Sequence, residues 1–427
     1  LLGSNIINCY IVSSNKKIII KTLKQLCLIK KKKNLSSKSI YSLAYNTIGD
    51  KDHDLMIDFL KKRKTLNQSE VTKTFEKKFS KYLGVKYTVF VNSGSSANLL
   101  MAQSLLEGKY LKNKTVIVPS VSWSTSVSPF LQLGYKVILC DCDKDNLGLD
   151  TQHLEKLCSK HNPGLIVLVN VLGHSNSIKK ILNLKKKYKF KIMEDNCESL
   201  GSSTKSKKLG TFGLASSHSL YYGHHISTIE GGLVSTNNRD LYNIFLAIRA
   251  HGWARDMEEN YKKKLEKKYK IDEFDSLYTF YYSGFNIRST DLNATIGINQ
   301  LKKINKISNI RNRNFYYYKK NLQQFWSQNS QLDLLSSFGY ATFIKNRTEV
   351  FKYLKSHKIQ SRPLICGNMG QQPFYKKNFT KQKLLKNASF VNKYGIYLPN
   401  HASLEPKNLD YIIKHFKSFA KPIFFKS

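Results

Sequence analysis

Residues 88–106 read TVFVNSGSSANLLMAQSLL and form a complete strand–turn–helix pattern. The apolar run Thr88–Val91 is typical of a buried strand, and Leu99–Leu106 is an apolar helical run. The turn between them, Asn92–Asn98, is made of small, mostly polar residues. Such residues let backbone amides and hydroxyls approach an anion at a helix N-terminus, where the helix dipole favours phosphate. Serine and glycine also form simple turns, so this stretch predicts an α/β unit and leaves an anion site open.

Short apolar strands and helical stretches go on alternating along the chain. Strands separated by helices predict a mostly parallel sheet that is covered on both faces. Helices are expected at Thr65–Tyr82, at Ala294–Ile304 and near Leu409–Phe419, where apolar residues recur at helical spacing. The further strands are expected at Thr115–Pro119, Lys136–Leu139, Leu165–Asn170, Phe190–Met193, His218–Tyr221 and Gly232–Ser235.

Three regions of different character are predicted. Residues 1–40 contain no acidic residue and include the run Lys30–Lys33. We expect them to form a loosely ordered basic extension or to be translated sequence upstream of the true start; a targeting peptide is the alternative. Residues 41–310 are expected to form a large domain with an N-terminal arm. Residues 311–427 are expected to form a smaller α+β domain.

The balance of charge is strongly basic. Lysine and arginine number 70 against 29 acidic residues, a formal net charge of +41. Such an excess can indicate a nucleic-acid partner. The lysines are scattered through the chain, however, and no helix-turn-helix, finger or RNA-binding signature is present. We therefore expect a broadly basic surface and no nucleic-acid partner.

Membrane and metal binding are not expected either. No apolar run approaches the roughly 20 residues that span a bilayer. The seven cysteines form no disulfide framework of the small secreted type. Cys140 and Cys142 end an apolar run that predicts a buried strand, and two cysteines without further ligands nearby are weak evidence for a metal site. These patterns favour a cytoplasmic enzyme with reduced thiols and no metal.

A second segment indicates the chemistry. Residues 219–232 read SLYYGHHISTIEGG. This segment resembles the cofactor-lysine segment of the DegT/StrS family, fold-type I sugar aminotransferases that depend on pyridoxal 5'-phosphate (PLP). In most of that family a lysine five residues after the serine forms a Schiff base with PLP, whereas this chain has His224 there. A histidine cannot form that stable imine, but it can move protons near neutral pH. The alternative for His224 and His225 is a structural pair that caps a loop.

The resemblance implies a cofactor site built from separated residues. Gly94, Ser95 and Ser96, joined by Ser219, match the loop that binds the cofactor phosphate. Trp123 matches an aromatic residue that stacks on the pyridine ring, although a tryptophan after a buried strand is usually part of the core.

Two carboxylates complete the implied cofactor site. Asp195 would keep the pyridine nitrogen protonated, unless it only caps the next helix. Glu198 stands where most of the family has glutamine, so it would be a second acid or base beside the phenolic oxygen.

Three further residues carry weaker implications. Asn286 lies in a segment that resembles the family's Gly-Tyr-Asn-x-Arg motif, whose asparagine reaches the phosphate bound by the neighbouring subunit. Carried over, it implies a homodimer with shared active sites; an Asx-turn before a helix is the alternative. His225 and Arg362 are candidate contacts to the substrate.

The exchange of lysine for histidine resembles one branch of the family in particular. That branch contains the 3-dehydrases of GDP-4-keto-6-deoxymannose and CDP-4-keto-6-deoxyglucose. The iron–sulfur members carry a cysteine cluster shortly after the Gly-Trp-x-Arg-Asp segment, whereas Gly252–Met257 is followed here by lysine-rich sequence without cysteine. Cys197 alone matches a ligand position, and one thiolate cannot hold a cluster that needs about four.

The resemblance therefore implies a cluster-free enzyme that uses PLP and pyridoxamine 5'-phosphate (PMP). It would remove the C3 hydroxyl of a nucleotide-linked 4-keto-6-deoxy sugar, with glutamate as amino donor, on the way to a dideoxy sugar of O-antigen or another surface glycan. The alternatives are a nucleotide-sugar aminotransferase and a non-catalytic protein that only binds the cofactor. The sequence does not identify the nucleotide or the hexose.

Overall fold

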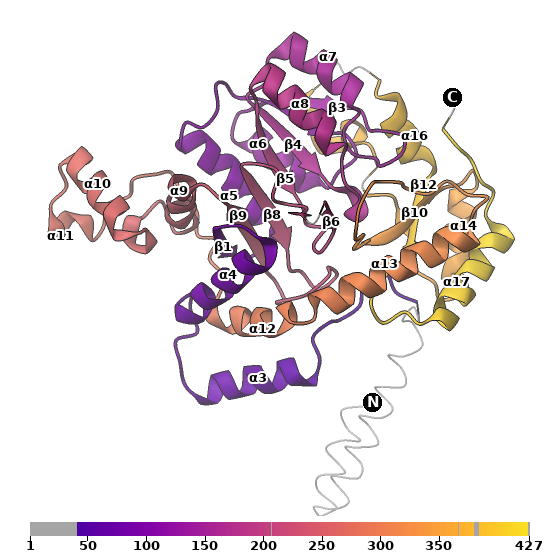
Figure 1. Ribbon diagram of the computed structural model, residues 1–427, viewed down its shortest axis with the longest axis horizontal. Helices are drawn as coiled ribbons and strands as arrows, with labels where there is room; N and C mark the ends of the chain where they lie inside the picture. The colour runs from indigo at the N-terminus through magenta and orange to yellow at the C-terminus, as the bar shows by residue number, and fades with distance from the viewer. Residues whose placement is uncertain (1–40, 206, 366, 380–383, 426–427) are drawn as a thin grey trace, which may run out of the picture.

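The computed structural model describes residues 41–425 except 206, 366 and 380–383. The predicted basic extension, residues 1–40, lies outside the described residues. Figure 1 shows a large sheet wrapped by helices and a smaller sheet beside it, with the long helix α13 (Ile304–Asn321) running below both.

The large sheet has seven strands in the order β1-β9-β8-β5-β4-β2-β3. All neighbouring pairs are parallel except the two pairs that β9 makes, with β1 and with β8. The predicted mostly parallel sheet is therefore confirmed. The strands, in that order, are β1 (Tyr87–Val91), β9 (Gly232–Thr236), β8 (Ala215–Ser219), β5 (Lys191–Asp195), β4 (Leu165–Val169), β2 (Thr115–Pro119) and β3 (Lys136–Cys140).

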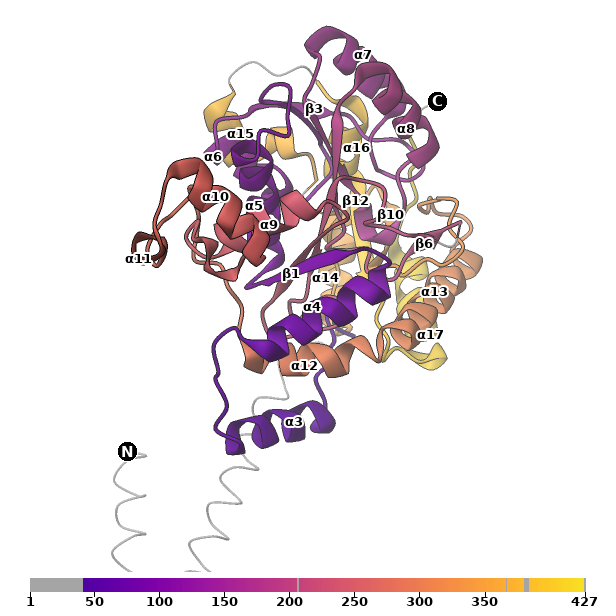
Figure 2. The same cartoon turned by 60° about the vertical axis from the view of Figure 1, so that its left-hand side comes forward.

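Helices cover both faces of this sheet. Successive residues of a strand point to opposite faces, so each face presents apolar side chains that a helix layer buries. Val116 and Val118 pack in one core cluster with residues of α5 and α6, while Ile117 between them packs with residues of α7 and α8. Phe90 of β1 packs against α4 on that second face. Figure 2 shows the layers from the side. The helices are α4 (Glu70–Leu83), α5 (Gly94–Glu107), α6 (Ser128–Gln132), α7 (Thr151–His161), α8 (Ile178–Tyr188), α9 (Arg239–Arg249) and α12 (Asp291–Leu301).

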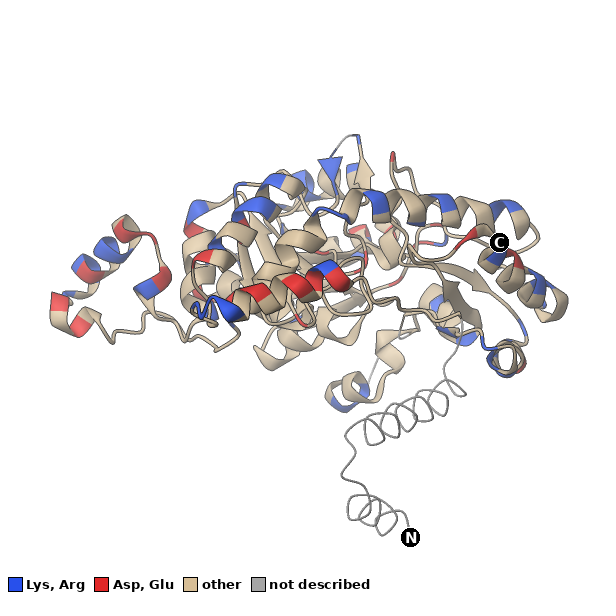
Figure 3. Ribbon diagram, turned by 90° about the horizontal axis from the view of Figure 1, so that it is seen from below, with Lys and Arg blue, Asp and Glu red and all other residues tan. Residues whose placement is uncertain are grey.

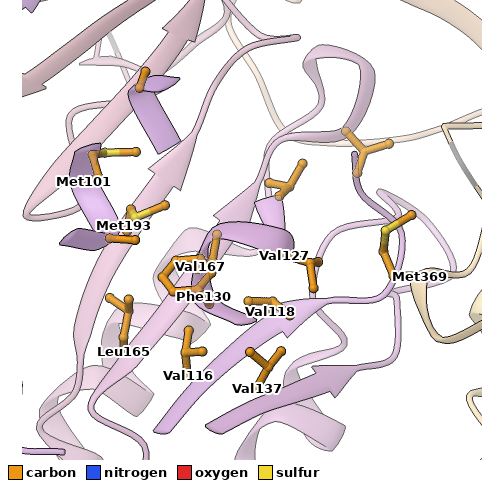
Figure 4. Close-up of a cluster of buried hydrophobic side chains, with 14 of the residues drawn as sticks. Met101, Val116, Val118, Val127, Phe130, Val137, Leu165, Val167, Met193 and Met369 are labelled. Atoms are coloured by element: carbon orange, nitrogen blue, oxygen red, sulfur yellow. The ribbon is translucent and has the colours of Figure 1, made fainter. Parts of the chain in front are cut away.

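The largest group of buried side chains packs between the sheet and the helices α5 and α6. Figure 4 shows Val116 and Val118 of β2 and Val167 of β4 facing Phe130 of α6, with Met101 of α5 close by. Each of these side chains is wholly buried. Full burial of one such side chain contributes roughly 1.5–3 kcal/mol to folding.

A second, antiparallel sheet lies in the C-terminal part, in the order β10-β12-β11. Helix α13 runs across position 310, so the two predicted domains share a continuous helix there. The boundary at residues 310/311 stays a prediction. The elements are β10 (Gly339–Phe343), α14 (Arg347–Ser356), β11 (Arg362–Pro363), α15 (Pro373–Asn378), α16 (Lys386–Tyr394), β12 (Gly395–Pro399) and α17 (Pro406–Phe419).

Two predicted boundaries are wrong for physical reasons. The helix expected from Thr65 begins at Glu70, because the Asp291 carboxylate accepts hydrogen bonds from the amides of Ser69, Val71 and Thr72. That distant carboxylate fixes the helix N-terminus. The strand expected at His218–Tyr221 is β8, which ends at Ser219 because the chain then turns out of the sheet.

Several helices were not placed from the sequence. Among them are α3 (Asp50–Lys61), α10 (Glu259–Tyr269) and α11 (Glu273–Ser276), of which α10 and α11 form an arm that projects from the body (Figure 1). Lysine and arginine lie on many elements, as Figure 3 shows. Within the described part of the chain, no helix is both long and apolar enough to cross a membrane.

Candidate active site

The predicted cofactor residues meet at one edge of the large sheet. Strands β1, β2, β5 and β8 run parallel to one another, so their carboxyl ends lie at the same edge. Gly94 follows β1, Trp123 follows β2, Asp195 ends β5 and Ser219 ends β8. Ligands of open α/β sheets bind outside this edge.

The turn before α5 approaches β8 very closely. A Cβ atom on Gly94 would lie 2.6 Å from Cβ of Ser219 and 2.9 Å from Sγ of Cys197, so only glycine fits there. The Ser93 hydroxyl accepts a hydrogen bond from the Ser96 amide at 3.0 Å and caps the helix. Ser95 is exposed in the first turn. This helix N-terminus therefore presents hydroxyls and a positive dipole end, as a phosphate requires.

Asp195 is a buried carboxylate held by neutral donors. It is 5% exposed, and its Oδ2 accepts from Nδ2 of Asn98 and from the Ser126 hydroxyl, each at 2.7 Å. Its Oδ1 accepts from the Cys197 amide at 3.1 Å. No ion pair joins it to a basic residue in the described chain. A buried carboxylate is costly without a cation, so this site suits a protonated ring nitrogen.

His224 lies in a loop that leaves the sheet after Ser219. Its amide donates to the Tyr221 carbonyl at 2.9 Å in a tight turn, and its ring lies 5.1 Å from the ring of Phe338. Burial lowers the pKa of His224 to about 4; a backbone hydrogen bond to Cys197 opposes this shift, and the positive charge of Arg311 adds to it. The ring is therefore neutral near pH 7. Nδ1 is buried without a hydrogen-bond partner among the described residues. A neutral imidazole can accept a proton at its unprotonated nitrogen.

His225 points elsewhere. Its ring is fully buried, and Nε2 lies 2.8 Å from the Ser336 carbonyl oxygen. These contacts give His225 a structural role, and its predicted contact with substrate stays a prediction.

Glu198 follows β5, three residues after Asp195. Its Oε2 accepts from the Leu172 amide at 3.0 Å. Burial raises the pKa of Glu198 to about 7, although the Leu172 amide opposes that shift. The carboxyl group is thus poised to hold or release a proton near neutral pH.

Glu198→Gln is expected to stabilise the cofactor-free protein at alkaline pH. The folded protein binds the Glu198 proton more tightly than the unfolded chain, so stability falls as pH rises from the ordinary pKa of 4.5 to about 7. Glutamine keeps an acceptor for Leu172 and carries no charge. We expect the Tm of the variant to exceed that of the wild type at pH 8 and to match it near pH 4. If the Tm difference between variant and wild type were the same at both pH values, the raised pKa of Glu198 would be contradicted.

Trp123 is not part of the core. It is 53% exposed and precedes the 3-10 turn η1 (Ser124–Ser126), whose last residue holds Asp195. An exposed indole beside Asp195 has a face available for stacking on a flat ring.

Asn286 and Arg362 lie apart from this group. Asn286 is exposed and lines a separate cavity of about 330 Å³. The other residues around that cavity are Asn67, Gln68, Arg255, Arg288, Ser289 and Thr290. Arg362 is exposed on β11, the edge strand of the small sheet.

Sequence reasoning missed the residues that support the site. Asn98 and Ser126 hold Asp195, and Glu194 fixes the 210–213 loop by accepting from the amides of Gly210, Phe212 and Gly213. Asn98 lies in the quoted turn, so its position after the serines was a usable signal. Ser126 carries no sequence signal of its own. Arg311, close behind His224, was also missed.

These residues fit PLP. They offer a helix N-terminus for the phosphate, a buried carboxylate without a cation for the ring nitrogen, and an exposed indole for the ring face. No group of three or more His, Cys, Asp or Glu within the described ranges is arranged to hold a metal ion.

Comparisons with known proteins agree with this geometry. The model of the DegT/DnrJ/EryC1/StrS aminotransferase family matches residues 46–417. GDP-4-keto-6-deoxy-D-mannose 3-dehydratase of Yersinia pseudotuberculosis is 35% identical over 81% of this chain and 91% of its own length. The enzyme of the same name from Escherichia coli O55:H7 is 33% identical, over 87% and 98%.

A solved structure is similar as well. It is a GDP-4-keto-6-deoxymannose-3-dehydratase with a trapped PLP–glutamate geminal diamine. It superposes with a TM-score of 0.79 at 30% identity, over 88% of this chain and 99% of that one.

Proposed function

Because the chain belongs to the DegT/DnrJ/EryC1/StrS aminotransferase family, we propose that it is a PLP- and PMP-dependent sugar 3-dehydratase. Its substrate is GDP-linked 4-keto-6-deoxymannose, and it removes the C3 hydroxyl without an iron–sulfur cluster. The observation that carries this proposal is His224, a neutral, half-buried imidazole at the position of the family's lysine. Relatives with that activity, 33–35% identical over most of their length, support the choice of substrate.

Each residue of the site has a defined task in this reaction. When bound, the cofactor supplies a ring that accepts electrons. Ser95, Ser96 and Ser219 bind its phosphate, and Trp123 covers its face. Asp195 keeps the ring nitrogen protonated through its carboxylate. The imidazole of His224 accepts a proton and returns it, and the departing C3 hydroxyl needs such a proton to leave.

The absence of a lysine at position 224 sets the outcome. A lysine would capture the cofactor covalently and complete an ordinary transamination. An imidazole moves protons and forms no such tether, so elimination of the C3 hydroxyl can proceed. Overall, the sugar loses one oxygen atom while glutamate is converted to 2-oxoglutarate and ammonia.

A panel of nucleotide sugars tests this proposal. The purified protein is incubated with PLP, glutamate and, in separate reactions, the GDP-, CDP-, UDP- and dTDP-linked 4-keto-6-deoxyhexoses. The amounts of ammonia and 2-oxoglutarate that form are measured. We expect equal amounts of both with the GDP sugar. Formation of 2-oxoglutarate without ammonia would indicate an aminotransferase, since the nitrogen would stay on the sugar.

We further propose that two copies of the chain share their active sites. Asn286, Arg255 and Arg288 line one cavity, and Arg288 makes no ion pair within the described residues. A guanidinium group without an ion pair, as that of Arg288, suits a phosphate when an amide lies beside it. That cavity contains none of the residues around His224, so its anion comes from a partner's site.

Mixing two inactive variants tests the shared site. His224→Asn and Asn286→Ala are each expected to be inactive alone. After unfolding and refolding together, hybrid dimers contain one site with both intact residues, so about a quarter of the wild-type activity should return. Mixing without refolding is the control. No recovery after refolding would contradict shared sites.

The cell compartment also belongs to this proposal. Cys140, Cys142, Cys158 and Cys197 are free thiols, which is typical of a reducing compartment. We place the enzyme in the cytoplasm.

A further inference from the structure

Arg311 is a buried cation behind the candidate site. It lies on α13 and is 3% exposed. Its Nη1 donates to the backbone carbonyls of Ser337 at 3.1 Å, of Phe338 at 3.2 Å and of Asn400. Its Nε is buried without a partner in the described structure. A buried charge that meets only carbonyl dipoles costs folding free energy, so this arrangement is unusual for a purely structural residue.

The backbone that Arg311 holds is the one on which the histidine loop rests. The Phe338 ring lies 5.1 Å from the ring of His224 and 6.1 Å from that of His225. The Ser336 carbonyl meets Nε2 of His225 at 2.8 Å. The Arg311 guanidinium lies 5.9 Å from the centre of the Phe338 ring, within the range of a cation–π contact. Arg311 therefore fixes both the backbone and the ring that position His224.

The charge of Arg311 also acts on His224. Burial is the largest influence on the His224 pKa and lowers it, and the Arg311 charge lowers it further. The opposing groups are the Cys197 backbone and the Asp195 carboxylate at the end of β5. Tyr221 of the same loop lies 6.3 Å away, and the neighbouring His225 is neutral because burial and Arg311 lower its pKa well below 6.5. Arg311 is thus the fixed positive charge that faces this ring.

We propose that Arg311 is a positioning residue for the reaction: it clamps the Ser337–Phe338 backbone under His224 and places its fixed positive charge on that side of the imidazole. This role rests on the proposed function of His224. Arg311 acts in two ways: its guanidinium fork donates hydrogen bonds to backbone carbonyls, and it carries a positive charge. Different substitutions at position 311 separate these two effects.

The experiment uses four variants of the full chain. Arg311→Met removes the charge and the fork, whereas Arg311→Lys keeps the charge and loses the fork. Arg311→Gln is also neutral but keeps amide donors for the carbonyls, so it tests the charge if the methionine variant does not fold. Arg313→Met is the matched control, because Arg313 is exposed two residues further along α13 and, among the described residues, bonds only to Asn314.

The first readout is the pH titration of the His224 imidazole by NMR in the cofactor-free protein, with the signal assigned by its loss in His224→Asn. We expect the midpoint to rise by about one pH unit in Arg311→Met and Arg311→Gln, because a nearby positive charge is removed. It should stay at the wild-type value in Arg311→Lys and Arg313→Met. Midpoints in both neutral variants equal to that of Arg313→Met would overturn the role of the charge.

The second readout is turnover. Arg311→Lys is expected to lower kcat about tenfold with little change in KM, since a small displacement of a catalytic group is costly. A kcat equal to that of Arg313→Met would overturn the role of the clamp. The titration needs no substrate, so it stays informative if the wild type turns over no nucleotide sugar, a result that would reject the proposed function instead.

Discussion

His224→Asn is expected to slow removal of the C3 hydroxyl by about 10²- to 10⁴-fold, the range that a general acid–base residue contributes. Asparagine is of similar size and hydrogen-bonding shape, but it cannot accept and return a proton. The ring it replaces is neutral near pH 7 because burial lowers the pKa of His224 to about 4. The rate of 2-oxoglutarate formation with the GDP sugar measures the effect.

A second substitution at this position tests the direction of the chemistry. His224→Lys restores the amine of the family's other members, so we expect little deoxygenation and covalent capture of the cofactor, visible in its absorbance spectrum. His161→Asn, at the end of α7, is the control and should behave as the wild type. Full dehydratase activity in both His224 variants would refute proton transfer by His224.

Asp195→Asn is expected to lower turnover by about 10²- to 10³-fold, as removal of one preorganised electrostatic group does. Asparagine still accepts from Asn98 and Ser126 with its oxygen, but its amide then faces the Cys197 amide, a donor against a donor. The variant therefore loses the charge that balances the ring nitrogen and one internal hydrogen bond.

Turnover and retention of the cofactor during dialysis measure this second effect. Ser126→Ala serves as the comparison, because it removes one donor to Asp195 and leaves the charge in place. We expect its loss of turnover to be smaller than that of Asp195→Asn, because the carboxylate charge remains and keeps its other donors. Equal turnover of Asp195→Asn and wild type would show that the carboxylate does not act on the cofactor.

Much of the fold could be predicted because its signals are local. The five-residue apolar run Thr115–Pro119 forms a strand, and the turn at Gly94 joins a strand to a helix, as the local sequence predicts. The start of α4 could not be predicted, because the capping carboxylate of Asp291 comes from a segment far along the chain.

The site divides in the same way. Asp195 and Ser219 end strands, so a sequence pattern can place them at the edge of the sheet. The residues that hold the site in place come from distant parts of the sequence. Ser126 donates a hydrogen bond to Asp195, and Arg311 holds the backbone beneath His224. Hydrophobic period and motif spacing contain no information on such pairs, which only the packed structure brings together.

The mass of the sugar product tests the central claim most directly. Purified protein is incubated with PLP, glutamate and GDP-4-keto-6-deoxymannose, and the nucleotide sugar is analysed by mass spectrometry. A product that is lighter than the substrate by one oxygen atom is the result we predict. A product that carries nitrogen in place of the ketone oxygen would contradict the account, because the enzyme would then be an aminotransferase in spite of His224.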